Sequence, residues 1–164
     1  MKKIIFLFIS VFFYDGAGAQ ESPKRINYDS LKVMPPFQYY TIEGNAFTQA
    51  DLKKKKQTVF IFIKMGCPYC AEELEIIKKN ISDFSNTQFY LVSRADSSEL
   101  KKFYSDYALI MYPQINILWD KDRKYYKYTI ARVTPSIHIY DNKKRLLIFS
   151  EGVMNKVELS KYID

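Results

Sequence analysis

Apolar and polar positions alternate along the chain in a way that separates strands from helices. The run of residues 58–63 is apolar on both alternating sets and rich in β-branched and aromatic side chains. Such a run predicts a central strand covered on both faces. Immediately after it, Leu74, Ile77, Ile81 and Phe84 recur at helical spacing, which predicts an amphipathic helix following the strand.

The predicted helix is expected to begin at Cys67 and Pro68. Proline is tolerated in a first helical turn, because its missing amide would have no helical partner there. Acidic residues lie early in the stretch and basic residues late, as the helix dipole favours. These residues are Glu72, Glu73 and Glu75, followed by Lys78 and Lys79.

The remaining pattern predicts further strands and helices in alternation. Strands are expected at residues 38–42, 89–92, 115–119, 136–140 and 145–150. Helical segments are expected at residues 48–55, 97–108 and 155–163. Ser97 or Ser98 is expected to cap the helix of residues 97–108. This order indicates an α/β domain in which strands 58–63 and 89–92 are parallel. The two cysteines then lie at the carboxyl end of the central strand, where sites form in open α/β sheets.

The amino-terminal residues read as an export signal followed by a leader. Two lysines precede the apolar run of residues 4–13, and Ala17-Gly18-Ala19 follows it, which is the layout of a secretory signal peptide. The apolar run is about half the roughly 20 residues that a spanning helix needs. We therefore expect a signal peptide over residues 1–19, a polar and proline-containing leader over 20–36, and a single domain over 37–164.

The basic charge of the chain belongs mainly to the predicted domain. The formal net charge is +7, and loss of residues 1–19 removes two lysines and one aspartate, which leaves +6. The lysine run of residues 53–56 is typical of a solvated turn. Because an exported protein is separated from nucleic acid, we expect no nucleic-acid partner. We also expect no stable membrane insertion after the signal peptide is cleaved.

The chain has only two cysteines, Cys67 and Cys70. A bridge between them would close a very short loop and would constrain the unfolded chain little. At a helix amino terminus, unpaired amides and the helix dipole stabilise a thiolate, so Cys67 is predicted to attack disulfides. Cys70 lies three positions later on the same helical face, and is predicted to resolve the mixed disulfide.

The cysteine pair also has to be considered as a metal site. A zinc site would need four ligands, and two cysteines with the single histidine, His138, do not readily supply them. We therefore expect no metal site. Two soft thiolates do suit Cu(I), so a copper carrier stays an alternative, as does a pair of inert thiols or an idle bridge.

The strand, the sequence Cys67-Pro68-Tyr69-Cys70 on a helix, and Val133-Thr134-Pro135 before a later strand together resemble the thioredoxin superfamily. The resemblance implies that Pro135 is a cis-proline facing the cysteines. It also implies that the backbone beside Thr134 and Pro135 holds the substrate peptide by strand-like hydrogen bonds. Pro68 and Tyr69, which lie between the cysteines, are assigned together with Thr134 and Pro135 to the substrate-binding surface.

Within the superfamily, the chain is most similar to the exported reductases typified by cytochrome c maturation (TlpA-like) and to the related AhpC/TSA-like architecture. The similarity lies in residues 42–48, in the sixty-five positions between Cys70 and Pro135, and in residues 140–143 with Gly152. It implies a thioredoxin-like α/β fold with a central mixed sheet flanked by helices. The fold would carry an amino-terminal hairpin extension and an insertion before the cis-proline.

The sequence also departs from the family patterns. Met65-Gly66 replaces the tryptophan usual before the first cysteine, and Ile61 stands where thioredoxin has a buried aspartate. Glu73 matches instead the buried glutamate of the cytochrome-c-type reductases, where it serves proton transfer to the resolving thiol. The alternative for Glu73 is a favourable surface charge. A peroxidase is not expected, because the threonine and proline that frame a peroxidatic cysteine are missing.

The function predicted from these features is an exported thiol-disulfide oxidoreductase that exchanges electrons with protein cysteines in the periplasm. Its partners would be cysteine-containing envelope proteins and an upstream thiol reductant or oxidant, and the direction of electron flow stays open. No cofactor is expected beyond the Cys67–Cys70 pair, and we expect a monomer. The alternative function is a non-catalytic carrier of copper or a binding scaffold of the same fold.

Overall fold

The computed structural model describes residues 32–164. The predicted signal peptide of residues 1–19 and most of the predicted leader lie outside the described residues. No helix among those described is long and apolar enough to cross a membrane.

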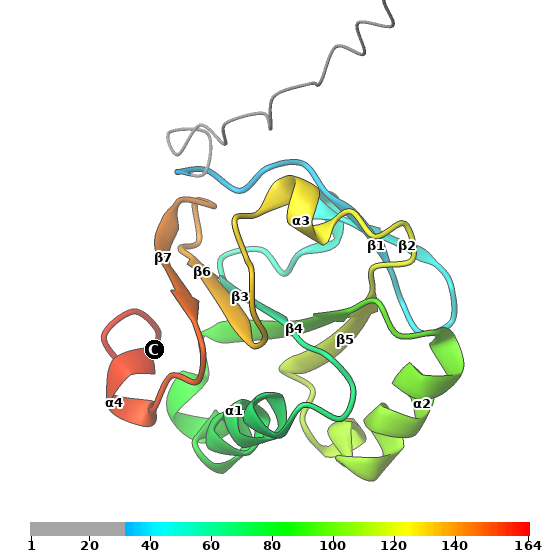
Figure 1. Ribbon diagram of the computed structural model, residues 1–164. Helices are drawn as coiled ribbons and strands as arrows, with labels where there is room; N and C mark the ends of the chain where they lie inside the picture. Colours follow the sequence, from blue (N-terminus) through cyan, green and yellow to red (C-terminus); the bar gives the residue numbers. More distant parts are fainter. Residues whose placement is uncertain (1–31) are drawn as a thin grey trace, which may run out of the picture.

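Within residues 32–164, seven strands form one mixed sheet in the order β2-β1-β5-β4-β3-β6-β7 (Figure 1). The strands are β1 Gln38–Tyr40, β2 Ala46–Thr48, β3 Gln57–Phe62, β4 Thr87–Ser93, β5 Ile115–Trp119, β6 Ser136–Tyr140 and β7 Leu146–Glu151. β3, β4 and β5 are parallel, and the other neighbouring strands pair antiparallel. The predicted parallel pair and the predicted mixed sheet are confirmed.

β3 is an interior strand between β4 and β6. Val59 lies opposite Phe89 of β4 and Ile139 of β6, and the strand is buried over residues 58–62. This agrees with the continuous apolar run in the sequence, because a strand covered on both faces has no polar face to show.

Helical segments connect the strands. They are η2 Gln49–Asp51, α1 Pro68–Lys79, η3 Ile81–Phe84, α2 Ser97–Asp106, η4 Leu109–Met111, α3 Tyr125–Tyr128 and α4 Lys156–Leu159, where η marks a 3-10 helix. The cap of α2 is Asp96, whose side chain accepts the Glu99 amide at 2.9 Å. The expectation of Ser97 or Ser98 at this cap was wrong.

Two predicted helices are shorter than their apolar spacing indicates. α1 ends at Lys79 and is capped by Asn80, whose side chain donates to the Ile76 carbonyl at 2.7 Å. η3 then carries Phe84 into the core. The carboxyl-terminal helix, expected over residues 155–163, is α4 and ends after one turn. In both places a tight turn preserves the apolar spacing without a continuous helix.

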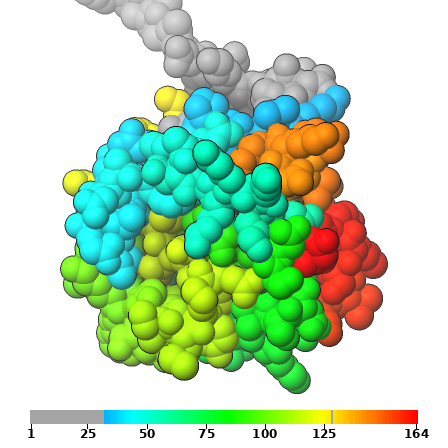
Figure 2. Space-filling model, turned by 180° about the vertical axis from the view of Figure 1, so that it is seen from behind, coloured from blue at the N-terminus to red at the C-terminus, as the bar shows by residue number. Residues whose placement is uncertain are grey.

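Part of the predicted leader is packed on the domain. Val33 bridges Arg145, the Met34 amide donates to the Lys144 carbonyl at 2.8 Å, and the Met34 side chain is buried. Figure 2 shows this blue segment beside the orange β6–β7 hairpin. Residues 32–36 therefore act as part of the folded unit.

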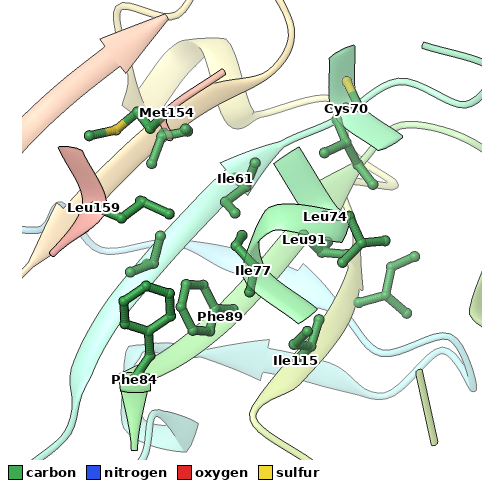
Figure 3. Close-up of a cluster of buried hydrophobic side chains, with 14 of the residues drawn as sticks. Ile61, Cys70, Leu74, Ile77, Phe84, Phe89, Leu91, Ile115, Met154 and Leu159 are labelled. Carbon is green, nitrogen blue, oxygen red and sulfur yellow. The ribbon is translucent and has the colours of Figure 1, made fainter. Parts of the chain in front are cut away.

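Each face of the sheet supports one hydrophobic core. α1, α2 and α4 cover one face, where Figure 3 shows Leu74 and Ile77 of α1 against Ile61 of β3. The amino-terminal segment, Leu52 after η2, and α3 cover the other face, with Phe60 and Tyr125 in its core. A sheet covered on both sides is the layered arrangement expected of an α/β domain.

Candidate functional site

The site begins where β3 passes into α1. β3 ends at Phe62 and α1 begins at Pro68, so a short loop carries Cys67 to the helix amino terminus as its N-cap residue. Gly66 in this loop has a φ of 72°, a left-handed conformation that glycine adopts without strain. The Cys70 amide donates to Cys67 Sγ at 3.3 Å, so the helix end solvates this sulfur.

Cys67 is a free cysteine and is partly exposed. Burial raises its pKa, but hydrogen bonds from Cys70, from Thr134 and from the Tyr69 amide lower it, and the pKa lies below the ordinary value of a cysteine. A lowered pKa increases the thiolate fraction near neutral pH, and the thiolate is the reactive form.

Cys70 has the opposite character. It is buried, and burial together with the neighbouring Cys67 sulfur raises its pKa to about 12. Figure 3 shows Cys70 at the amino end of α1, in the same cluster of buried side chains as Leu74. The two thiols of one motif are therefore electrostatically unequal, as an attacking and a resolving cysteine should be.

Glu73 lies inside the protein, so its interpretation as a surface charge is wrong. Its side chain lies on α1, one helical turn after Cys70, and the residue is 1% exposed. Glu73 Oε2 accepts the Met154 amide at 2.7 Å, and Oε1 has no hydrogen-bond partner among the described residues. Burial raises the pKa of Glu73 to about 7, although the Met154 hydrogen bond opposes the shift.

Thr134 and Pro135 form the opposite wall of the site. β6 begins directly after them, and its first residue, Ser136, lies opposite Phe62 at the end of β3. The Thr134–Pro135 peptide bond is cis. The Thr134 hydroxyl and carbonyl each lie 3.8 Å from Cys67 Sγ. The antiparallel pairing of β6 with β3 thus brings together residues that are 67 positions apart.

Two hollows flank the exposed side of Cys67. One, of about 370 Å³, is lined by Cys67, Pro68 and side chains of α2. The other, of about 530 Å³, lies on the Thr134 side. Lys64, Met65 and Glu99 line both, so the two hollows adjoin. Tyr69, between the two cysteines in sequence, is 62% exposed and lines neither hollow.

His138 lies elsewhere in the molecule. It is buried in β6 on the other face of the sheet, where its Nδ1 is 3.0 Å from the Tyr125 hydroxyl. In residues 32–164 no group of three or more histidine, cysteine, aspartate or glutamate side chains is placed to hold a metal ion. His138 and Cys67 are therefore not brought together as ligands.

The sequence patterns did not single out Arg94, Arg132 or Tyr126 as part of this region, yet all three line the larger hollow. Arg94 follows β4 directly, and β4 is parallel to β3. Residues that follow adjacent parallel strands meet at one edge of the sheet. That rule was the available signal for Arg94, whereas α3 and its tyrosines gave no comparable signal.

Solved structures of low sequence identity share this fold. A secreted Mycobacterium tuberculosis disulfide oxidoreductase, described as homologous to Escherichia coli DsbE, is 23% identical with a TM-score of 0.63, and the match covers 83% of this chain and 97% of that one. A pneumococcal exposed lipoprotein thioredoxin from Streptococcus pneumoniae is 17% identical with a TM-score of 0.62, covering 77% and 96%. StoA from Bacillus subtilis is 19% identical with a TM-score of 0.58, covering 80% and 98%.

The search of curated proteins gave no match. The AhpC/TSA family model, in contrast, matches residues 31–152, a span that includes the cysteine pair, Glu73 and the Thr134–Pro135 wall. The folds of the similar structures agree with the resemblance in the sequence motifs. The chain therefore belongs to the AhpC/TSA family and has the thioredoxin-like fold.

Proposed function

We propose that this protein is a thiol-disulfide oxidoreductase that exchanges electrons with cysteines of other proteins through Cys67 and Cys70. The observation that carries the proposal is the inequality of the two thiols. Cys67 is accessible and has a lowered pKa, whereas Cys70 is buried and has a raised pKa. A pair of inert thiols would not need this difference.

In the reducing direction, the Cys67 thiolate attacks one sulfur of a substrate disulfide. The other substrate sulfur leaves as a thiolate and takes up a proton. Cys70 then loses its proton and attacks the Cys67 sulfur of the mixed disulfide, which releases the second substrate thiol. The protein is oxidised by two electrons to the Cys67–Cys70 disulfide, and the oxidising direction uses the same steps in reverse.

Glu73 supplies the proton transfer that the second step needs. A thiol with a pKa of about 12 does not ionise near neutral pH without a base, and Glu73 has a pKa of about 7 one turn along α1. General bases work best when their pKa lies near the operating pH. Glu73 accepts the Cys70 proton during resolution and returns it when the pair is reduced.

The substrate polypeptide lies across Cys67, between the loop that ends at Pro135 and the turn of Pro68 and Tyr69. Thr134 presents backbone groups next to Cys67 Sγ, so an extended substrate segment can pair with it as an added strand. Exposed Tyr69, two residues after Cys67, offers an aromatic surface to the same segment.

The proposed location is the periplasm, after cleavage near Ala19. The signal-like pattern of residues 1–19 supports export, and two proteins of similar fold are described as secreted and as an exposed lipoprotein. The partners would be cysteine-containing envelope proteins and a thiol reductant or oxidant upstream. The protein would act as a monomer and use no cofactor apart from its two cysteines.

Reduction of insulin with dithiothreitol, followed as turbidity, tests the proposal. The mature wild-type protein should accelerate it. Cys67→Ser should abolish the acceleration, because the attacking sulfur is lost. Cys70→Ser should stop turnover and accumulate a mixed disulfide at Cys67, visible by mass spectrometry.

Equal rates for wild type and both variants would refute the oxidoreductase. Retention of one Cu(I) per chain by such an inactive protein would instead support the alternative of a copper carrier.

A further inference from the structure

The larger hollow beside Thr134, of about 530 Å³, has an uneven distribution of charge. We call it the basic pocket. Three cationic residues line it, Lys64, Arg94 and Arg132, against one acidic residue, Glu99. It adjoins Cys67 through Met65 and Thr134, so a substrate segment passing over the sulfur reaches it.

The guanidinium of Arg94 is held in a fixed place. Its central carbon lies 4.0 Å from the ring centroid of Tyr126 and 5.6 Å from that of Phe62. Its Nε lies 3.6 Å from Oδ2 of the buried Asp120. Stacking and this ion pair leave the side chain 32% exposed. A guanidinium placed in advance loses little conformational entropy when it binds a ligand.

The donors of Arg94 are not used up by Asp120. That carboxylate already accepts the amides of Lys124 at 2.7 Å and Tyr125 at 3.0 Å. Arg94 Nε is buried on the Asp120 side and has no hydrogen-bond partner among residues 32–164, so an incoming ligand meets the two terminal nitrogens of the guanidinium. Since a guanidinium carries five N–H donors in a planar fork, an incoming carboxylate can still bind it in bidentate fashion.

The other acidic groups near the pocket are likewise engaged with backbone amides. Glu151 Oε1 accepts the Arg132 amide at 2.6 Å, and Glu99 Oε2 accepts the Asp96 amide at 3.3 Å. The first contact positions the chain at Arg132, whose side chain is exposed. Beside it, Val133 is 50% exposed and supplies an apolar wall. The pocket therefore offers free cationic donors and engaged carboxylates.

We propose that the basic pocket selects substrate proteins that carry an aspartate or glutamate next to the reacting cysteine. The inference rests on the proposed oxidoreductase function and specifies its substrate class. The carboxylate of the substrate binds Arg94 and Arg132 while Cys67 attacks the neighbouring disulfide. The protein's two thiols supply the two electrons, and the peptide disulfide becomes two thiols.

Single-turnover reduction of peptides by the pre-reduced protein tests this selection. Three peptides with one internal disulfide would differ only in the residues flanking the cysteines, which are glutamate, glutamine or lysine. At low salt the glutamate peptide should react about fivefold faster than the lysine peptide, with glutamine between them. The ratio should fall toward one in molar salt, because screening weakens exposed charge pairs.

A matched pair of charge reversals locates the effect. Arg132→Glu should remove most of the preference for the glutamate peptide. Lys143→Glu makes the same change of charge in the β6–β7 turn. This turn lies at the other end of β6 from the site, because Tyr140 pairs with Thr58 and Ser136 with Phe62. The variant should therefore leave the preference unchanged. Both side chains are exposed, so neither change is expected to unfold the protein.

Equal rates for the three peptides with wild-type protein, or a preference for lysine, would overturn the inference and leave the oxidoreductase intact. An equal loss of preference in both variants would also overturn it, since the effect would then come from net charge. If no peptide is reduced in a manner that depends on Cys67, the proposed function fails as well.

Discussion

Two buried residues with shifted pKa values change the pH dependence of this protein's stability in opposite directions. Burial raises the pKa of Glu73 from an ordinary 4.5 to about 7. Burial lowers the pKa of His138 from 6.5 to about 4. Between pH 4.5 and 6.5 the native state holds an extra proton at Glu73 and lacks one at His138. The two pH dependences largely cancel in the wild-type protein.

The contribution of Glu73 becomes visible in the variant Glu73→Gln. A raised native pKa stabilises the fold fully below pH 4.5, and this stabilisation is lost as pH rises through 7. The free energy of unfolding of Glu73→Gln relative to wild type should therefore rise by about 3 kcal/mol between pH 4 and pH 8. Urea denaturation at several pH values measures the difference.

The matched control is Glu75→Gln on the same helix, where the side chain is exposed. This change also removes a carboxylate from α1, but an exposed one, so it shows how much of the effect belongs to the buried position of Glu73. A flat difference for Glu73→Gln would contradict a raised pKa at Glu73. Because His138 contributes equally to wild type and variant, it does not disturb the comparison.

Among the elements, α4 is a very short helix that lies next to the site. It consists of one turn, Lys156–Leu159, yet it buries Leu159 in the core. Just before it, Met154 donates its amide to Glu73. So short a helix has little stability of its own, and its cap therefore matters for the geometry around Glu73.

Removal of this cap by Asn155→Ala should destabilise the protein by about 1 kcal/mol. The Asn155 side chain accepts the Glu158 amide at 3.1 Å, and alanine leaves that amide without its partner. Chemical denaturation measures the loss. Asn155→Asp retains an acceptor and should stay close to wild type. Equal destabilisation by both changes would show that the cap is not the cause.

At the scale of the whole molecule, both faces of the sheet must be covered for the site to form. α1 covers one face and carries Cys67 and Cys70 at its amino end. On the other face, the core includes Met34 from the segment of residues 32–36. This segment pairs with the turn that joins β6 to β7, so it supports the strand that follows Pro135.

A comparison of Met34→Ala with Val33→Ala tests whether this segment belongs to the fold. Met34 is 4% exposed, and its truncation should cost about 2 to 5 kcal/mol. Val33 is 56% exposed, and its truncation should change stability by less than about 0.5 kcal/mol. Thermal and urea unfolding give both values. Similar small effects would assign the segment to a leader that does not contribute to the domain.

The sequence patterns predicted most of the sheet and the main helices correctly. β5 was expected at 115–119 and β6 at 136–140, as they are, because strong local periodicity survives packing. Helix ends were less predictable. α1 ends at Lys79 before its cap Asn80, α4 ends after one turn, and α2 is capped by Asp96. Local hydrogen bonds decide these ends and leave the apolar spacing unchanged.

The sequence by itself determined the spacing of Cys67 and Cys70 at the start of a helix and the covered strand before them, because motif spacing and hydrophobic pattern are local properties. Only the tertiary structure decided that Glu73 is buried and that Thr134 lies 3.8 Å from Cys67 Sγ. It also placed Arg94 and Arg132 around one pocket. Burial, pKa and pocket charge depend on residues that meet through strand pairing and packing. Many of these residues are far apart in the sequence, so local sequence patterns do not predict their contacts.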